Sequence, residues 1–392
     1  MIKIPMNCVD LYNGCGGLSR GFANAGYNLV AAFENWDPAI QCYKKNFKHA
    51  TYKLDLNNWQ SAVNIIKKKE CDIIIGGPPC QDFSNAGKRV EGEKAKLTVS
   101  FAKIVCAIKP RFFVMENVAR VNKSEAYTTA RELFKNAGYG LTEKVLNASY
   151  YGVPQNRKRF FCVGELNAQD GFLNDILTVN QSEFPLTVHN YLGDKMELTH
   201  YYRHPRSYSR RGVFSINEPA PTIRVSNRPL PSDYKRHEKD LVDPKENGIR
   251  ALTFKERAFI QTFPEDFLWL ESSSVNDELI GNAVPIKLAE HVANCISIYS
   301  ENPSQEVEIG FKEWLQKEKN YKPRAAGNVL SRIRRMKRQI IQKHDVKVNE
   351  TDLVSNFKEL GYFDVLTLSV RSQLKRAQTL YSEYYTTYLH GA

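Results

Sequence analysis

The sequence lacks the residue spacings that hold structural metal ions. Its eight cysteines are scattered along the chain, no two of them form a CxxC pair, and no histidines cluster at zinc spacing. We therefore expect no metal site.

Long apolar runs are absent as well. No stretch approaches the roughly 20 apolar residues that a membrane span needs, and the N-terminus has no charged region followed by an apolar core. We expect no membrane association, a cytoplasmic location and reduced cysteines.

Acidic side chains are too few to balance the basic ones. The 392 residues include 55 Lys and Arg against 43 Asp and Glu, a formal net charge of +12. Each cation placed on a phosphate releases condensed counterions, so this excess favours a polyanionic partner. Charge alone leaves DNA, RNA and an acidic membrane open.

The first 165 residues alternate strand-like apolar runs with amphipathic stretches, which is typical of βαβ units on a mostly parallel sheet. Residues 71–77 and 111–117 are short and apolar and end abruptly in turn-forming or polar residues, as buried parallel strands do. The sequence therefore predicts an α/β fold with its site at the carboxyl ends of the strands.

The pattern changes beyond residue 165. Residues 166–248 are rich in Pro, Arg, Tyr and Ser with little periodicity, which predicts an independent, loop-rich basic module. Helical periodicity returns in residues 249–303, which we expect to rejoin the first domain. Residues 304–392 predict a separate extension of three or four helices, one of them strongly basic.

A glycine-rich turn follows the first predicted strand, in residues 10–17 (DLYNGCGG). Glycines let a ligand approach the backbone, and the N-terminus of the next helix favours an anionic group. A turn without a ligand has the same sequence signature. Glu34 and Asp55 end the next two candidate strands, where they could bind a ribose and an adenine or simply face solvent.

One cysteine stands in a frame that packing does not require. Two glycines and two prolines at 76–79 follow a buried strand and predict a rigid, exposed loop that presents Cys80. Glu116 ends the next predicted strand at the same edge of the sheet, so a nucleophile and a proton donor would converge. A small buried thiol is the alternative for Cys80 and the expectation for the other cysteines.

A basic motif, QNRKR, occupies residues 155–159 directly before an apolar strand. Strand alternation places Arg157 and Arg159 on one face. A basic surface cluster is the alternative.

In chain order, DLYNGCGG, GGPPCQ, MENV, QNRKR and IGNAVP resemble the motif set of DNA cytosine-5 methyltransferases of the bacterial restriction-modification type. The resemblance covers about residues 6–300. It implies a Rossmann-like, S-adenosylmethionine-dependent catalytic domain in residues 1–165 and 249–303. It also implies a small target-recognition domain in residues 166–248, and leaves the helical basic extension, 304–392, outside the family core.

The resemblance implies methyl transfer from S-adenosylmethionine to carbon 5 of a flipped cytosine in a specific duplex DNA sequence. Cys80 would attack carbon 6, and Glu116 would contact ring nitrogen 3 and stabilise its protonation. Arg159 would hold the cytosine carbonyl oxygen, while Arg157 would be the more structural of the two arginines.

The resemblance also implies which residues line the pocket for S-adenosylmethionine and which part of the cofactor they contact. Its members are Tyr12, Gly14, Gly16 and Gly17 around the methionine part, Glu34 at the ribose, Asp55 at the adenine, and Pro79, Leu97, Asn282 and Val284 completing the pocket. Three positions depart from the family pattern. Tyr12 and Pro78 each replace a common Phe, and Asn35 stands where an aromatic residue often stacks on adenine, with Trp36 next to it.

Two basic segments are expected to meet the DNA. The loop at 82–97, with Lys88, Arg89, Lys94 and Lys96, should close on it. Arginines of the recognition segment suit phosphate contacts and bidentate reading of guanine, or phosphate contacts alone. They are Arg203, Arg206, Arg210, Arg211, Arg224 and Arg228.

Three other functions share parts of this pattern. A tRNA cytosine-5 methyltransferase would carry the same motifs, although the arginine-rich segment favours DNA. A catalytically silent DNA-binding protein would need lesions in the motifs, and the glycine turn alone also fits a nucleotide-dependent oxidoreductase. The basic stretch at 332–338 fits a solvated helix or an added DNA- or partner-binding module.

The family resemblance also implies a biological setting. We expect a monomer acting on double-stranded DNA at the bacterial nucleoid, with a cognate restriction endonuclease as its functional partner.

Overall fold

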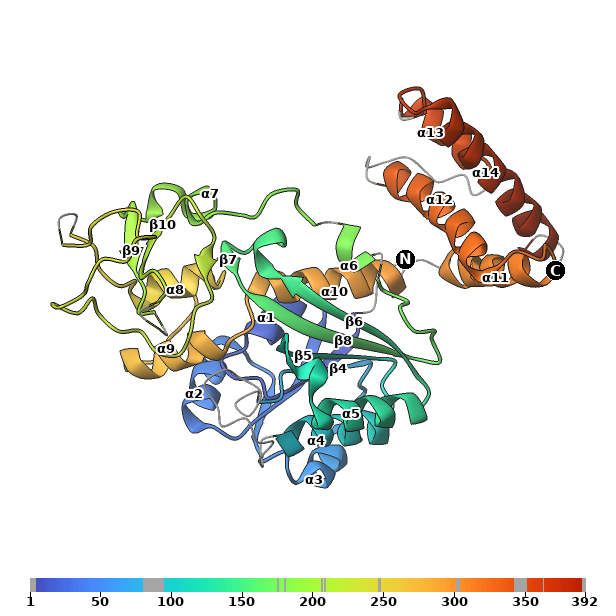
Figure 1. Cartoon of the computed structure of the whole chain (residues 1–392). Helices are drawn as coiled ribbons and strands as arrows, with labels where there is room; N and C mark the ends of the chain where they lie inside the picture. Colours follow the sequence, from blue (N-terminus) through green and yellow to red (C-terminus); the bar gives the residue numbers. More distant parts are fainter. Residues whose placement is uncertain are drawn as a thin grey trace. The chain divides into compact units, whose positions relative to one another are not determined.

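The structure, a computed structural model, describes most of the chain in two units (Figure 1). The described residues are 5–79, 95–174, 176–179, 181–205, 207, 209–245, 248–300, 304–341, 351–361 and 363–389. The chain divides into two compact units, unit 1 at Met1–Ser297 and unit 2 at Ile298–Ala392. Each unit is described by itself.

Unit 1 is built on a seven-stranded sheet in the order β3-β2-β1-β4-β5-β8-β6. The strands are β1 Asn7–Leu11, β2 Asn28–Glu34, β3 Ala50–Lys53, β4 Ile73–Gly76, β5 Phe112–Val118, β6 Tyr139–Asn147 and β8 Lys158–Leu166. The first five strands pair in parallel, and β8 pairs antiparallel with both β5 and β6. The predicted α/β class with a mostly parallel sheet is confirmed.

The central strands β4 and β5 are buried on both faces of the sheet. Their sequences are therefore continuous apolar runs and do not alternate between apolar and polar residues. On one face, Ile74 and Phe113 join a core with Phe101 and Phe134 from the helices that cover it. These helices are α3 Trp59–Ile66, α4 Ala95–Ile108 and α5 Glu125–Asn136 (Figure 1).

The opposite face carries helices from both ends of unit 1, α1 Gly17–Asn24 and α10 Ile286–Ser300 (Figure 1). A Cβ at Gly21 would lie 2.4 Å from that of Ala289, so the two helices are in close contact. The Tyr27 hydroxyl donates to the Ala293 carbonyl at 3.1 Å. Helix α2 spans Asp37–Asn46.

The segment after β8 has little regular structure. It contains α6 Ile176–Val179, α7 Val188–Leu192, β9 His200–Tyr202, β10 Val213–Ser215 and β11 Ala220–Pro221, followed by α8 Phe254–Ile260 and α9 Ser273–Asn282. Short 3-10 turns lie at Val121–Lys123, Ala148–Tyr150 and Gly193–Lys195. One core cluster includes Val188 and Ile223 from this segment together with Cys15 and Cys42, so the segment shares a core with the N-terminal part.

The segment at 166–248 is also tied to the sheet by a short parallel pair, β11 with β7 (Gln155–Asn156). The side chain of Gln155 reinforces it, because its Oε1 accepts from the Ile223 amide at 2.8 Å and its Nε2 donates to Gln261 at 2.7 Å. Gln261 in turn donates to the carbonyls of Ile280 and Ala283.

Arg157 lies at the centre of this junction and is 1 % exposed. Its guanidinium donates to the carbonyl of Ile223 at 2.8 Å, and to those of Gly281 and Ala283 at 3.1 and 2.9 Å. These carbonyls belong to segments about 70 and 120 residues away along the chain, as the spacings of 66, 124 and 126 show. One side chain therefore fixes two distant segments of backbone through three carbonyls.

Unit 2 consists of α11 Ser304–Lys317, α12 Pro323–Ile341, α13 Leu353–Glu359 and α14 Leu368–Leu389. It has its own apolar core, in which Phe311, Ile333, Phe357 and Tyr381 are fully buried. Lys337 on α12 donates to the Tyr381 hydroxyl at 2.7 Å. The helical character predicted for this extension is confirmed.

No helix in the described part of the chain is long and apolar enough to cross a membrane. Within the same residues, no group of three or more His, Cys, Asp or Glu side chains could hold a metal ion.

Replacement of Arg157 by Leu should lower the free energy of unfolding of unit 1 by about 3–5 kcal/mol, because it leaves buried carbonyls without donors. Urea unfolding followed by tryptophan fluorescence measures this change. Trp314 of unit 2 is replaced by Phe in the Arg157→Leu variant and in the reference protein that keeps Arg157. The tryptophan signal then reports unit 1 alone.

Arg111→Leu is the matched control. Its side chain is 54 % exposed and pairs with Glu165, so its loss should cost about 1 kcal/mol or less. Equal losses in the two variants would contradict a special role for the Arg157 guanidinium.

Candidate active site

The carboxyl ends of β1, β2, β4 and β5 meet at one edge of the sheet, since these strands are parallel. Most of the residues predicted for the site follow these ends. Cys80 and the loop up to residue 94 lie outside the described residues, and the structure describes the chain on either side of them.

The glycine turn after β1 is shaped by left-handed backbone. Tyr12, Gly14 and Gly16 have φ values of 61°, 53° and 96°. A Cβ at Gly17 would lie 2.3 Å from the Val284 carbonyl oxygen, so a glycine is required where α1 begins. The predicted pocket residues Gly17 and Val284 are therefore in direct contact, from opposite ends of unit 1.

Glu34, at the end of β2, organises the same turn. One carboxylate oxygen accepts from the Gly14 amide at 2.9 Å, and the other accepts from Asn35 and Trp36 at 2.8 and 3.0 Å. A carboxylate has about four acceptor positions, so it can still accept a ligand hydroxyl.

Tyr12 reaches across to the first turn of α4. Its hydroxyl donates to the Leu97 carbonyl at 2.9 Å, a contact that the phenylalanine expected from the resemblance could not make. Burial raises the pKa of Tyr12 well above its ordinary value, and the negative charges of Asp55 and Glu34 raise it further. The phenol therefore stays protonated as a donor.

The turn also has open space and unused polar atoms. A Cβ at Gly14 would meet no atom within 4 Å. The Asn13 Oδ1 and Thr98 Oγ1 atoms are buried and have no hydrogen-bond partner among the described residues. The turn therefore fits a ligand that carries polar or charged groups, as an amino acid moiety does.

The remaining predicted cofactor residues are more exposed. Asp55 accepts from the Asn57 amide at 2.9 Å, and Asn282 lies exposed at the end of α9. No hydrogen bond within the described residues joins either one to another predicted site residue. Pro79 is half-buried, and Trp36 packs against the core cluster that includes residues of α8 and α9.

A cavity of about 480 Å³ opens between α3 and α4, next to Asp55 in the sequence, and was not predicted. Its walls include Asn57, Trp59 and Lys103, and the Lys103 ammonium lies 5.8 Å from the Trp59 ring centre.

Glu116 on β5 and Arg159 on β8 form a buried ion pair. The strands are antiparallel with Val118 opposite Arg159, so the two side chains are diagonal neighbours on one face. Arg159 Nε lies 2.9 Å from Glu116 Oε1, and the side chains are only 14 % and 9 % exposed. Burial raises the pKa of Glu116, and the charges of Arg159 and then Arg157 oppose this rise.

The strand end that leads to Cys80 lies against this pair. A Cβ at Gly77 would be 3.2 Å from Glu116 Oε2. Asn117 donates from its side chain to the Pro78 carbonyl at 3.0 Å. The first residues of the Gly-Gly-Pro-Pro segment are therefore held beside the Glu116 carboxyl.

The other seven cysteines are all described and none is exposed. Burial raises the pKa of Cys71 to about 12 and that of Cys106 to about 11. A raised pKa keeps a thiol protonated and a poor nucleophile. These cysteines have the packing environment expected for them.

Sequence reasoning missed two features of this region. Gln261 is fully buried and holds the 280–283 turn, yet in the sequence it is only a polar residue directly after the last residue of α8. Thr98, one residue after Leu97, is fully buried, and its hydroxyl has no hydrogen-bond partner among the described residues. A single polar residue beside apolar ones is the only sequence signal for either.

Comparison with known proteins assigns the chain to a family. The model of the C-5 cytosine-specific DNA methylase family matches residues 6–297. Type II methyltransferase M.HindV of Haemophilus influenzae is 50 % identical over 299 residues, which is 76 % of this chain and 98 % of that protein. M.HgiDI of Herpetosiphon aurantiacus is 47 % identical, over 76 % of this chain and 96 % of its own.

Solved structures share the fold. The Dnmt2 methyltransferase of S. pombe and the methyltransferase EhMeth of Entamoeba histolytica each superpose with a TM-score of 0.60 at 17 % identity. Each match covers 76 % of this chain and 100 % of the other. With the family model spanning nearly all of unit 1, the chain belongs to the C-5 cytosine-specific DNA methylase family and is a DNA cytosine-5 methyltransferase.

Proposed function

We propose that this protein methylates carbon 5 of a flipped cytosine in a specific duplex DNA sequence, with Cys80 as the nucleophile and S-adenosylmethionine as the methyl donor. The buried Glu116–Arg159 pair carries the proposal. It places an acid and a cation at the strand edge where the segment leading to Cys80 begins.

The proposed reaction starts with the Cys80 thiolate. Its sulfur forms a bond to carbon 6 of the cytosine, and the electron pair of the 5,6 double bond moves into the ring and makes carbon 5 nucleophilic. Carbon 5 would take the methyl group, with S-adenosylhomocysteine as the leaving group. It would then lose its proton to a base such as water, and the returning electron pair would expel the Cys80 thiolate. A thiol cannot reach carbon 6 inside stacked DNA, so the base must be flipped out, at a typical cost of a few kcal/mol.

Glu116 and Arg159 would stabilise the charge that this attack generates. A protonated Glu116 can share its proton with ring nitrogen 3, which reduces the negative charge on the ring. Arg159, held in place by Glu116, can donate to the cytosine carbonyl oxygen. Arg157 has its guanidinium on three backbone carbonyls, which suits a supporting role beneath Arg159.

The glycine turn would hold the cofactor, whose sulfonium supplies the methyl group. The open space at Gly14 and the unpartnered atoms of Asn13 and Thr98 support a polar ligand there. Glu34 would accept from the ribose, and Asp55 from the adenine amino group. Tyr12, Gly16, Gly17, Pro79, Leu97, Asn282 and Val284 would complete the pocket.

The similar proteins from Haemophilus and Herpetosiphon are named type II methyltransferases. We therefore assign this enzyme to the modification half of a restriction-modification system. It would act as a monomer on double-stranded DNA, and a restriction endonuclease would share its target site.

The proposal is tested with purified protein, labelled S-adenosylmethionine and either tRNA or duplex DNA with randomised positions around a cytosine. Bisulfite sequencing maps any methylated base. We expect 5-methylcytosine in one short DNA sequence. Label on tRNA alone would indicate a tRNA methyltransferase, and no label despite cofactor binding would indicate a silent DNA-binding protein.

Cys80→Ser should abolish methyl transfer, because a hydroxyl does not replace the thiolate at neutral pH. Binding of S-adenosylmethionine, measured by calorimetry, should persist. Cys71→Ser is the matched control, since Cys71 precedes β4 and Cys80 follows it. Its activity should stay within about twofold of the wild-type value, and full activity of the Cys80 variant would exclude the mechanism.

Glu116→Gln should lower kcat by about 10²- to 10⁴-fold, the usual contribution of a general acid. The pKa of Glu116 is raised, so the wild-type enzyme should lose rate as the pH rises and this carboxyl loses its proton. The variant cannot titrate and should lack this decline.

Glu165→Gln provides the control for this pH profile. Glu165 lies on β8 and, like Glu116, is a carboxylate paired with an arginine, in this case Arg111. It lies opposite Phe112, at the start of β5 and away from the active edge of the sheet. Its variant should keep the wild-type pH dependence. The same alkaline decline in the Glu116 variant would show that another group causes it.

A further inference from the structure

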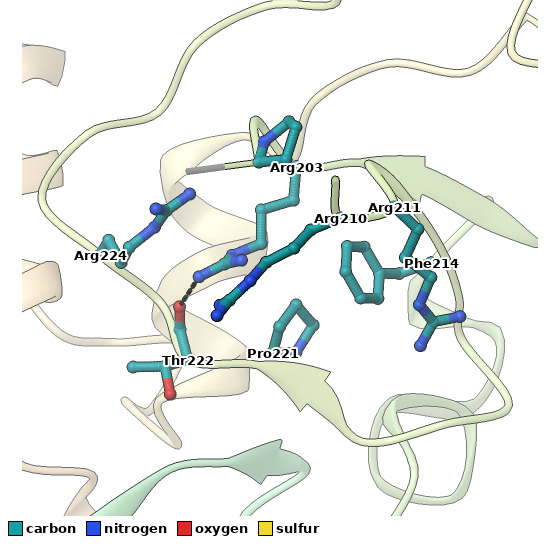
Figure 2. Close-up of a pocket in the computed structure, with 8 residues that line it drawn as sticks. Arg203, Arg210, Arg211, Phe214, Pro221, Thr222 and Arg224 are labelled. Atoms are coloured by element: carbon teal, nitrogen blue, oxygen red, sulfur yellow. Dashed lines mark hydrogen bonds between the residues drawn. The ribbon is translucent and has the colours of Figure 1, made fainter. Parts of the chain in front are cut away.

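Four arginines surround a hollow of about 420 Å³ in the recognition segment (Figure 2). They are Arg203, Arg210, Arg211 and Arg224, and Phe214 and Pro221 form part of the wall. Arg206, predicted with them, lies outside the described residues, and Arg228 is exposed. The four positive charges repel one another, and a ligand with negatively charged or hydrogen-bond-accepting atoms would relieve this repulsion.

Two of the four guanidiniums are held by backbone carbonyls. Arg203 donates to the Thr222 carbonyl at 2.8 Å, the bond drawn in Figure 2, and Arg224 donates to that of His204. The pKa of His204 is lowered by burial and then by the charges of Arg228 and Arg224, so the region carries a positive field. These contacts fix the walls of the hollow.

Arg211 is held by a carboxylate and an aromatic ring. Its guanidinium pairs with Glu218 and lies 4.4 Å from the centre of the Phe214 ring. Glu218 also accepts from the Ser215 amide at 3.0 Å, so the pair is anchored to β10. This arginine therefore has an intramolecular partner for its charge.

Arg210 differs from the other three. Its backbone amide donates to the Ser207 carbonyl at 3.0 Å, but its exposed guanidinium forms no hydrogen bond or ion pair within the described residues. Figure 2 shows its side chain extended into the hollow toward Pro221 and Thr222. Among the described residues, the other three guanidiniums each have an intramolecular acceptor, and that of Arg210 has none.

The hollow is coupled to the strand that leads to Arg159. Pro221 pairs with Asn156, and the Thr222 hydroxyl donates to the Asn156 carbonyl at 2.9 Å. Three residues of extended chain from Asn156 to Arg159 span at most about 10 Å. This distance corresponds to about three base-pair steps of DNA.

We propose that Arg210 is a specificity-determining residue that reads the O6 and N7 edge of a guanine close to the methylated cytosine. This inference rests on the proposed function. Arginine matches these two acceptors with two parallel hydrogen bonds, and no other base presents two acceptors on its major-groove edge. The fixed neighbours would keep the Arg210 side chain directed at the base.

The test compares Arg210→Lys and Arg210→Ala with the wild-type enzyme on the randomised duplex DNA, read by bisulfite sequencing. Both variants should relax the demand for guanine at one position, and its symmetric equivalent in a palindrome, by about 10- to 100-fold. Preferences at other positions should be unchanged. Lysine keeps the charge but lacks the planar fork, so it should lose the same base preference.

Arg228→Ala is the matched control, an exposed arginine of the same segment outside the residues that line the hollow. It should leave the base preference intact. The Arg210 variants could instead methylate every sequence more slowly by the same factor and bind DNA with a weaker dependence on salt concentration. Arg210 would then contact phosphate, and the inference would be wrong. An unchanged preference would also overturn it.

Failure of the proposed function gives a different result. In that case the wild-type enzyme itself would methylate no DNA in the pool, and the inference would fall with it. Binding of S-adenosylmethionine by both Arg210 variants checks that unit 1 is folded.

Discussion

The architecture of unit 1 depends on one buried cation. The Arg157 guanidinium donates to the carbonyls of Ile223, Gly281 and Ala283, so the segment at 166–248 and the turn after α9 are fixed beside the strand that bears Arg159. A buried charge is stable only when such partners surround it. The register of β5 and β8 sets Glu116 beside Arg159, and the buried Arg157 holds the neighbouring segments against the strand that bears them.

Local sequence patterns predicted the α/β class and the parallel strands at the centre of the sheet. Strands β4 and β5 are short apolar runs that stop at a glycine or an acid, and their parallel pairing places Gly76 and Glu116 at one edge. Strand β6 was missed, because Glu143 and Lys144 interrupt its apolar residues at the edge of the sheet. An edge strand is half solvated and its signal is correspondingly weak.

Contacts between distant residues could not be predicted from the sequence. The Tyr12 hydroxyl meets Leu97 only because α4 starts beside the glycine turn. Likewise, a count of arginines in residues 166–248 gives the sign of the local charge but not which guanidinium is already occupied. That distinction arises from single acceptors, such as Glu218 for Arg211, whose positions depend on the tertiary fold.

The contact between Gly17 and Val284 bears on when the enzyme becomes active during its synthesis. The first strand and its glycine turn leave the ribosome early, but the residue that closes the turn is made some 270 positions later. At typical elongation rates this interval lasts from roughly ten seconds to a minute. A nascent chain therefore carries an incomplete glycine turn until nearly all of unit 1 has been synthesised.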